Sequence, residues 1–236
     1  MSKPRIHILA LGGTIATRPD STGAMQMGLG ADDLVAAVPR LKDVAEIAAE
    51  TVSRVGSHSL SFDQIHALAA RIRGLAADGI VITQGTDTLE ETSFLLDLLL
   101  DLDIPVIVTA AMRNPALTSP DGPGNLLAAV RVAADPWVRG NARALGVLAV
   151  MLDEVYAAAD VLKVPHHGAA TSLPAFFEAV HARVAVVSVG ENTYGHPVPA
   201  TLASIAATGA QVWRTDQRGT ITIRFEDAVP LVQPAR

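Results

Sequence analysis

Two short segments of the chain place threonine hydroxyls beside glycine, each directly after an apolar run. Residues 12–16 read Gly-Gly-Thr-Ile-Ala, and residues 84–88 read Gln-Gly-Thr-Asp-Thr. Glycine permits a tight turn and a close approach of the backbone to a ligand. A threonine hydroxyl becomes an effective nucleophile once a neighbouring group removes its proton. The two segments therefore suggest nucleophilic chemistry carried by Thr14 and Thr86.

A lysine is the natural base for such a hydroxyl. The chain has three lysines, Lys3, Lys42 and Lys163, and of these only Lys163 falls at a predicted strand end. A lysine accepts a proton only if its pKa falls well below its free value of about 10.4, which burial or nearby cations achieve. Asp87 would hold the lysine in place and favour its charged form. The alternative is that both threonine segments are ordinary turns and helix caps with a structural role.

The elements that position these residues follow the rhythm of a parallel α/β sheet, in which apolar strands alternate with longer helices. Ligands bind beyond the carboxyl ends of the strands in such sheets, and both threonine segments fall there. We expect a parallel three-layer α/β/α domain followed by a smaller α/β segment. The predicted strands are 6–11, 44–55, 79–83, 105–109, 145–152, 160–164, 184–189, 211–214 and 220–225.

Helix starts are marked by residues that accept hydrogen bonds from free backbone N–H groups. Residues 61–64 (Ser-Phe-Asp-Gln) predict a capping box that opens a helix to about residue 77, and residues 88–91 (Thr-Leu-Glu-Glu) resemble a second one. Asp121 precedes a helical run over 125–134. Two further helices are expected in the tail, over 174–181 and 199–208.

Composition excludes several classes of protein. Half of the 236 residues are apolar, the net charge is -6, and cysteine is absent, so disulfides and thiolate metal sites are ruled out. No basic stripe of the kind that binds nucleic acid is present. The sequence holds neither a signal peptide nor an apolar run long enough for a membrane span. We therefore expect a cytoplasmic protein with no nucleic-acid or membrane partner.

Four ordered motifs resemble the bacterial-type L-asparaginase family. They are Leu-Gly-Gly-Thr-Ile-Ala at 11–16, Ile-Thr-Gln-Gly-Thr-Asp-Thr-Leu-Glu-Glu-Thr at 82–92, Val-Thr-Ala-Ala-Met-Arg at 108–113 and Asp-Gly-Pro-Gly-Asn-Leu-Leu at 121–127. The resemblance covers residues 5 to about 163. It implies a cofactor-free amidohydrolase that converts L-asparagine, or a related ω-amide, to aspartate and ammonia through a threonine nucleophile.

The resemblance also implies roles for particular residues. Thr14 would be the nucleophile that forms an acyl-enzyme, with Thr86, Asp87 and Lys163 as a second triad. The implied substrate-binding residues are Ser57 for the α-carboxylate, Asp87 for the α-ammonium, His58 where many members carry glutamine, and the backbone carbonyl of Ala111 near the leaving amide.

The sequence departs from the family in the loop that follows the first threonine. Members usually carry a tyrosine there, whereas residues 16–30 contain none, and Met25, Gln26 and Met27 take its place. Closure of such a loop normally excludes water and completes the site. We therefore expect slow catalysis.

The second departure begins after Lys163. Residues 161–168, 183–197 and 212–220 resemble the end of the metallo-β-lactamase-fold domain of DNA-uptake competence proteins. We therefore predict a hybrid of two parts, 1–160 and 161–236, which is a natural fusion, an engineered chimera or a recombined sequence. The usual second asparaginase domain, from which a neighbouring subunit completes the site, is then replaced, so homo-oligomerisation stays open.

The histidines of the tail raise the question of a metal. His166, His167 and His196 are candidate zinc ligands. The early His-x-His-x-Asp-His cluster of the metallo-β-lactamase fold is absent from the sequence, so we expect no metal site and a scaffolding role for the tail. Two alternatives to an active amidohydrolase remain: an inactive asparaginase-like hybrid, and a metal-dependent phosphodiesterase remnant in the tail.

Overall fold

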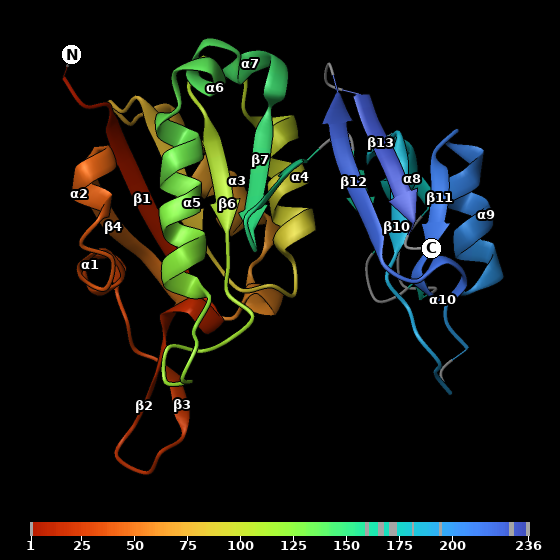
Figure 1. The fold of residues 1–236 in the computed structure, drawn as a ribbon, viewed down its shortest axis with the longest axis horizontal. Coiled ribbons are helices and arrows are strands. Elements are labelled where there is room, and N and C mark those ends of the chain that lie inside the picture. The colour runs from red at the N-terminus through yellow and green to blue at the C-terminus, as the bar shows by residue number, and fades with distance from the viewer. Residues whose placement is uncertain are drawn as a thin grey trace. The chain divides into compact units, whose positions relative to one another are not determined.

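The chain folds into two compact units, Met1–Ala157 and Ala158–Arg236, which are drawn in Figure 1. The computed structural model describes residues 2–158, 161–164, 168–169, 174–180, 182–193, 195–226 and 229–234. The first unit ends at residue 157, whereas the boundary predicted from the sequence was residue 160.

The first unit is built on a six-stranded sheet with the order β4-β1-β5-β6-β7-β8. Five of these strands run parallel, which confirms the predicted parallel sheet. Their nearly continuous apolar sequences suit strands that are covered on both faces. The strands are β1 (Arg5–Gly12), β4 (Glu46–Val55), β5 (Gly79–Thr83), β6 (Val106–Thr109), β7 (Val147–Met151) and β8 (Glu154–Ala157).

The edge strand β8 is antiparallel to β7 and was not predicted. The two strands are joined by Leu152 and Asp153, whose φ angles are 54° and 62°. Two-residue hairpin turns with positive φ at both positions usually contain asparagine, aspartate or glycine. Because leucine at the first position gives no turn signal, the sequence predicts a single strand over 145–152 and no hairpin.

Helices cover both faces of this sheet and make three layers, as predicted (Figure 1). Helices α1 (Ala31–Ala36), α2 (Leu41–Val44) and α5 (Gly122–Ala134) pack on one face, around a core that includes Ile8, Val81 and Ile107. On the other face, α3 (Phe62–Arg73) packs against α4 (Leu89–Leu99), and α4 packs on β6 and β7. The short helices α6 (Pro136–Gly140) and α7 (Ala142–Leu145) lead into β7.

The start of α3 confirms the predicted capping box. The Ser61 hydroxyl accepts a hydrogen bond from the Gln64 N–H at 3.3 Å, and the Gln64 side chain accepts one from the Ser61 N–H at 2.9 Å. The second predicted box, at the start of α4, is wrong. Thr88 occupies the N-cap position, but its hydroxyl donates to the carbonyl of Ser57 at 3.0 Å instead of capping the helix.

The second unit contains a parallel three-stranded sheet with the order β11-β10-β9. Its strands are β9 (Val161–Lys163), β10 (Val184–Val187) and β11 (Gln211–Arg214), and its helices are α8 (Pro174–Val180), α9 (Pro199–Ala207) and α10 (Thr215–Arg218). An antiparallel pair, β12 (Ile221–Glu226) and β13 (Val229–Pro234), follows. This is the smaller α/β segment that the sequence predicted. Among the described residues, no helix has the length and apolar character needed to cross a bilayer.

Candidate active site

Four loops leave the carboxyl ends of adjacent strands on one edge of the large sheet. In the sheet order β4, β1, β5 and β6, they carry Ser57, Thr14, Thr86 and Ala111. Parallel strands end at the same edge, so segments that are distant in the sequence become neighbours there. The fold thus gathers the residues singled out in the sequence at the place where such sheets bind ligands.

The loops after β1 and β5 touch through the backbone of two glycines. A Cβ atom on Gly13 would lie 2.1 Å from the backbone nitrogen of Gly85 and 2.3 Å from its Cα. Gly13 also has φ 80° and ψ -178°, a conformation that is essentially restricted to glycine. Because Thr14 and Thr86 directly follow these glycines, the contact brings both threonines to the same part of the edge.

The two threonines lie in loops at this edge, and both are partly exposed. Thr14 begins the short 3-10 helix η1 (Thr14–Ala16), and its carbonyl accepts a hydrogen bond from the Thr17 hydroxyl at 2.8 Å. Thr86 lies in the loop between β5 and α4. Solvent, and therefore a ligand, reaches both residues at the sheet edge.

Ser57 fixes the position of Asp87 from the neighbouring loop. Ser57 begins η2 (Ser57–Ser59) after β4 and is only 1% exposed. Its hydroxyl accepts a hydrogen bond from the Asp87 N–H at 3.1 Å and lies 3.3 Å from Asp87 Oδ2. The Ser57 carbonyl accepts the hydroxyl of Thr88, and a Cβ on Gly85 would lie 2.7 Å from Ser57 Oγ. The loops after β4 and β5 thus form one hydrogen-bonded structure.

The loop after β6 is held by Asp121 and Asn125 at the start of α5. The buried Asn125 side chain donates to the carbonyl of Ala110 at 2.9 Å and accepts the N–H of Leu152 at 2.9 Å. Asp121 accepts the N–H groups of Met112 at 2.9 Å and Arg113 at 2.8 Å. The side chain of Ala111 is fully buried in this loop.

The same contacts set the charge state of Asp121. Partial burial raises the pKa of this carboxyl, but hydrogen bonds from the backbone N–H groups of Met112 and Arg113 and from the Asn125 amide outweigh burial and lower the pKa overall. The carboxylate therefore stays ionised and keeps the β6–α5 loop in place. Ile15, next to Thr14, packs against Gly122 at the start of α5, so this loop also borders the first threonine.

Comparisons with known proteins agree with this arrangement. A family model described as "Asparaginase, N-terminal" matches residues 5–197. The chain belongs to the asparaginase family. The match continues past residue 160 into the second unit.

Individual relatives show the same family. L-asparaginase 2 of Bacillus subtilis (strain 168) is 42% identical over 168 residues, covering 68% of this chain and 44% of that protein. L-asparaginase 2 of Escherichia coli (strain K12) is 42% identical over 168 residues, covering 69% and 47%. The chain spans about half the length of the curated relatives it matches. The crystal structure of a probable cytoplasmic L-asparaginase from Campylobacter jejuni superposes with a TM-score of 0.59 at 25% identity, covering 96% of this chain and 87% of that chain.

Lys163 is the one predicted catalytic residue that belongs to the second unit of this asparaginase-family structure. Its backbone lies in β9 of the second unit and pairs with Val186 of β10. Its side chain falls outside the described structure. Whether the Lys163 amine reaches Thr86 therefore stays a prediction.

The loop after Thr14 is an ordered β-hairpin of β2 (Thr17–Pro19) and β3 (Met25–Met27), which projects from the sheet in Figure 1. Its turn is held by Asp20, which accepts hydrogen bonds from Thr22, Ala24 and Gln26. These bonds, above all that from the Thr22 hydroxyl, lower the pKa of Asp20.

The inner end of this hairpin touches the candidate site. The Met27 sulfur accepts a hydrogen bond from the Gly13 N–H at 3.1 Å. Residues 25–27 are the ones predicted to replace the family's tyrosine. One of them therefore contacts the backbone immediately before Thr14, and the replacement itself remains a prediction.

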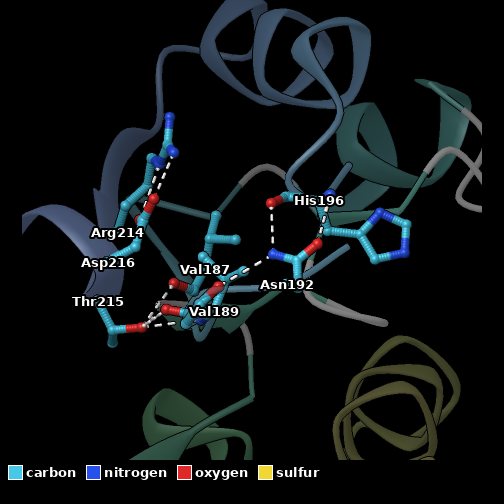
Figure 2. A network of polar contacts seen from close by, with 8 residues as sticks. Val187, Val189, Asn192, His196, Arg214, Thr215 and Asp216 are labelled. Atoms are coloured by element: carbon cyan, nitrogen blue, oxygen red, sulfur yellow. Dashed lines mark hydrogen bonds and ion pairs between the residues drawn. The ribbon is translucent and has the colours of Figure 1, made fainter. Parts of the chain in front are cut away.

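The second unit has a polar network of its own at the carboxyl ends of β10 and β11, which Figure 2 shows. The Thr215 hydroxyl donates to the carbonyl of Val189 at 2.8 Å and accepts the N–H of the same residue at 2.8 Å. Asn192 donates to the carbonyl of His196 at 2.9 Å and accepts its N–H at 3.1 Å. Arg214 pairs with Asp216. These contacts order the loop after β10 through backbone groups.

The tail histidines give no metal centre within the described residues. His166 and His167 lie outside the part of the chain that the structure describes. His196 is described, and no group of three or more histidine or carboxylate side chains placed to hold a metal occurs among the described residues. The absence of a metal site formed by the three histidines therefore stays a prediction.

Sequence reasoning underestimated two residues, Gln84 and Asn125. Gln84 is fully buried, and its amide donates to the carbonyls of Gly85 at 3.2 Å and Thr88 at 3.1 Å, which shapes the turn that presents Thr86. Asn125 was assigned to a helix and to the fourth family motif without a role of its own, but it joins the loop after β6 to the β7–β8 turn. Its place in that motif was the signal that could have found it.

Proposed function

We propose that the protein hydrolyses L-asparagine, or a related ω-amide, to aspartate and ammonia, with Thr14 as the nucleophile. The observation that carries the proposal is the contact between Gly13 and Gly85, which brings two partly exposed threonine hydroxyls to one edge of the sheet. Membership of the asparaginase family and the similarity to named L-asparaginases support the same reaction.

The proposed reaction has two halves. Thr14 Oγ bonds to the amide carbon while the hydroxyl proton is transferred towards the leaving nitrogen, and the C–N bond breaks to release ammonia. Water then attacks the resulting ester, so that the carboxylate leaves and the threonine hydroxyl is restored. We assign Thr86, Asp87 and Lys163 to proton transfer in these steps, with neutral Lys163 accepting the proton of Thr86.

Substrate binding follows from the loop after β4. Asp87 is a carboxylate at the site edge that suits an ammonium group, and Ser57 holds it in place through two contacts. We assign Ser57 to the α-carboxylate of the substrate, Asp87 to its α-ammonium and the backbone of Ala111 to the leaving amide. His58 belongs to the same binding region, because its ring lies 3.4 Å from the Asp87 carboxylate.

The test is ammonia release from L-asparagine by the parent protein and by Thr14→Ala and Thr86→Val. Both variants should lose at least about two orders of magnitude in kcat, the usual effect of removing a group used in covalent or acid–base catalysis. Thr220→Val is the matched control, because Thr220 is an exposed threonine of the second unit. Equal activity in all four proteins would refute the assignment.

The rival is an asparaginase-like protein that binds ligand without turnover. We infer from the resemblance of residues 161–236 that they derive from a metallo-β-lactamase-like segment, although the asparaginase family match extends to residue 197. The partner-supplied part of the site would then be missing. Calorimetric binding of L-aspartate with no ammonia release would favour this rival. We also propose that the protein resides in the cytoplasm and that it assembles into a homo-oligomer.

A further inference from the structure

The residue that follows Ser57 is a histidine whose ring lies against Asp87. His58 Nδ1 is 3.4 Å from Asp87 Oδ2, and the two side chains are 70% and 62% exposed. The ring also folds back over Gly56, where an added Cβ atom would lie 2.5 Å from His58 Cε1. Glycine at position 56 therefore leaves the space that the imidazole occupies.

One carboxylate oxygen of Asp87 contacts two side chains, those of Ser57 and His58. Oδ2 lies 3.3 Å from the hydroxyl of Ser57 and 3.4 Å from His58 Nδ1. Ser57 belongs to the same short helix and is uncharged. Asp87, from the loop between β5 and α4, is the charged group that the described residues place against the ring. The interaction of the imidazole with its surroundings is therefore dominated by this carboxylate.

We propose that His58 makes ligand binding at this site pH-dependent, because its protonated ring competes with the ligand's ammonium group for Asp87. The proposal rests on the proposed function, in which Asp87 binds that ammonium. Imidazole is the side chain that ordinarily changes charge between pH 5 and 8. When the ring is positive, it neutralises the carboxylate and repels a second cation. When the ring is neutral, the carboxylate is left to the ligand.

The sign and size of the effect follow from this geometry. Binding of an amino acid weakens as the pH falls, since protonation adds a positive charge beside the ammonium site. Two unit charges roughly 7 Å apart, on either side of one exposed carboxylate, change the affinity roughly three- to sevenfold in a solvent-like dielectric. A ligand without an ammonium group lacks this repulsion, so its affinity does not fall.

The test is calorimetry at pH 5 and pH 8 with L-aspartate and with succinamate, the asparagine analogue that lacks the α-amino group. All proteins carry Thr14→Ala, so that turnover does not contribute heat. In this background L-aspartate should bind about fivefold more weakly at pH 5 than at pH 8, as the distance above implies. His58→Gln should reduce that ratio to below about twofold, and succinamate should show no such loss in either protein.

The matched control is His66→Gln, which removes an exposed histidine of α3. It should keep the pH dependence of the background protein. An unchanged pH ratio in His58→Gln would overturn the proposal while leaving the proposed function intact. Absence of binding by either ligand at both pH values, together with no ammonia release by the parent, would overturn the proposed function and this inference with it.

Discussion

Replacing Gly13 with alanine should destabilise the first unit strongly and separate the two threonine loops. The backbone conformation of Gly13 costs other residues about 1–3 kcal/mol. The new methyl group would also lie 2.1 Å from the backbone nitrogen of Gly85. Because both partners are backbone, the clash is not relieved by a side-chain rotation, and overpacking of this kind costs about 1–3 kcal/mol more. We expect a total loss of about 2–6 kcal/mol.

Two other glycines serve as controls for this variant. Gly23, at the hairpin tip, has φ 87° and nothing within 4 Å of an added Cβ, so alanine there meets strain of about 1–2 kcal/mol without a clash. Gly124 lies in α5 with open space around it, and alanine there should stabilise the helix by up to about 1 kcal/mol. Urea denaturation measures all three variants. In a Trp213→Phe background, Trp137 fluorescence reports the first unit alone.

The comparison between Gly13→Ala and Gly23→Ala isolates the clash. If their unfolding free energies agree within about 0.5 kcal/mol, the additivity limit of such measurements, the contact between the two loops contributes nothing and the reasoning is refuted. A folded Gly13→Ala protein with undiminished ammonia release would equally show that the close approach of the loops is not needed for activity.

Two further predictions concern stability. The lowered pKa of Asp121 means that its contribution is fully present above the unfolded value of about 3.9 and is lost as the pH falls through the lower, folded value. In Asp121→Asn the free energy of unfolding should therefore fall less steeply as the pH is lowered from about 5 to 2. An unchanged pH dependence of the unfolding free energy would contradict this prediction. Ser61→Ala removes half of the capping box of α3 and should cost about 1 kcal/mol in urea denaturation, whereas Thr88→Ala should not act through helix capping.

Much of the first unit was predictable because its signals are local. The strand over 79–83 was predicted with its observed bounds, since continuous apolar β-branched sequence has few alternatives. The capping box at Ser61 was predicted because both partners lie within one turn of helix. The β7–β8 turn was missed because Leu152, at the first turn position, adopts a positive φ that leucine rarely takes, and Asp153 alone gives only a weak turn signal.

The sequence by itself determined the apolar strands, the helix starts and the residue types that place this chain in the asparaginase family. Only the tertiary structure decided which of those residues meet. Thr88 was read as a helix cap, but its hydroxyl bonds to Ser57, which is 31 residues away along the chain. Gly13 and Gly85 come into contact because their strands are adjacent and parallel. Such contacts depend on the order of strands in the sheet, which no local pattern encodes.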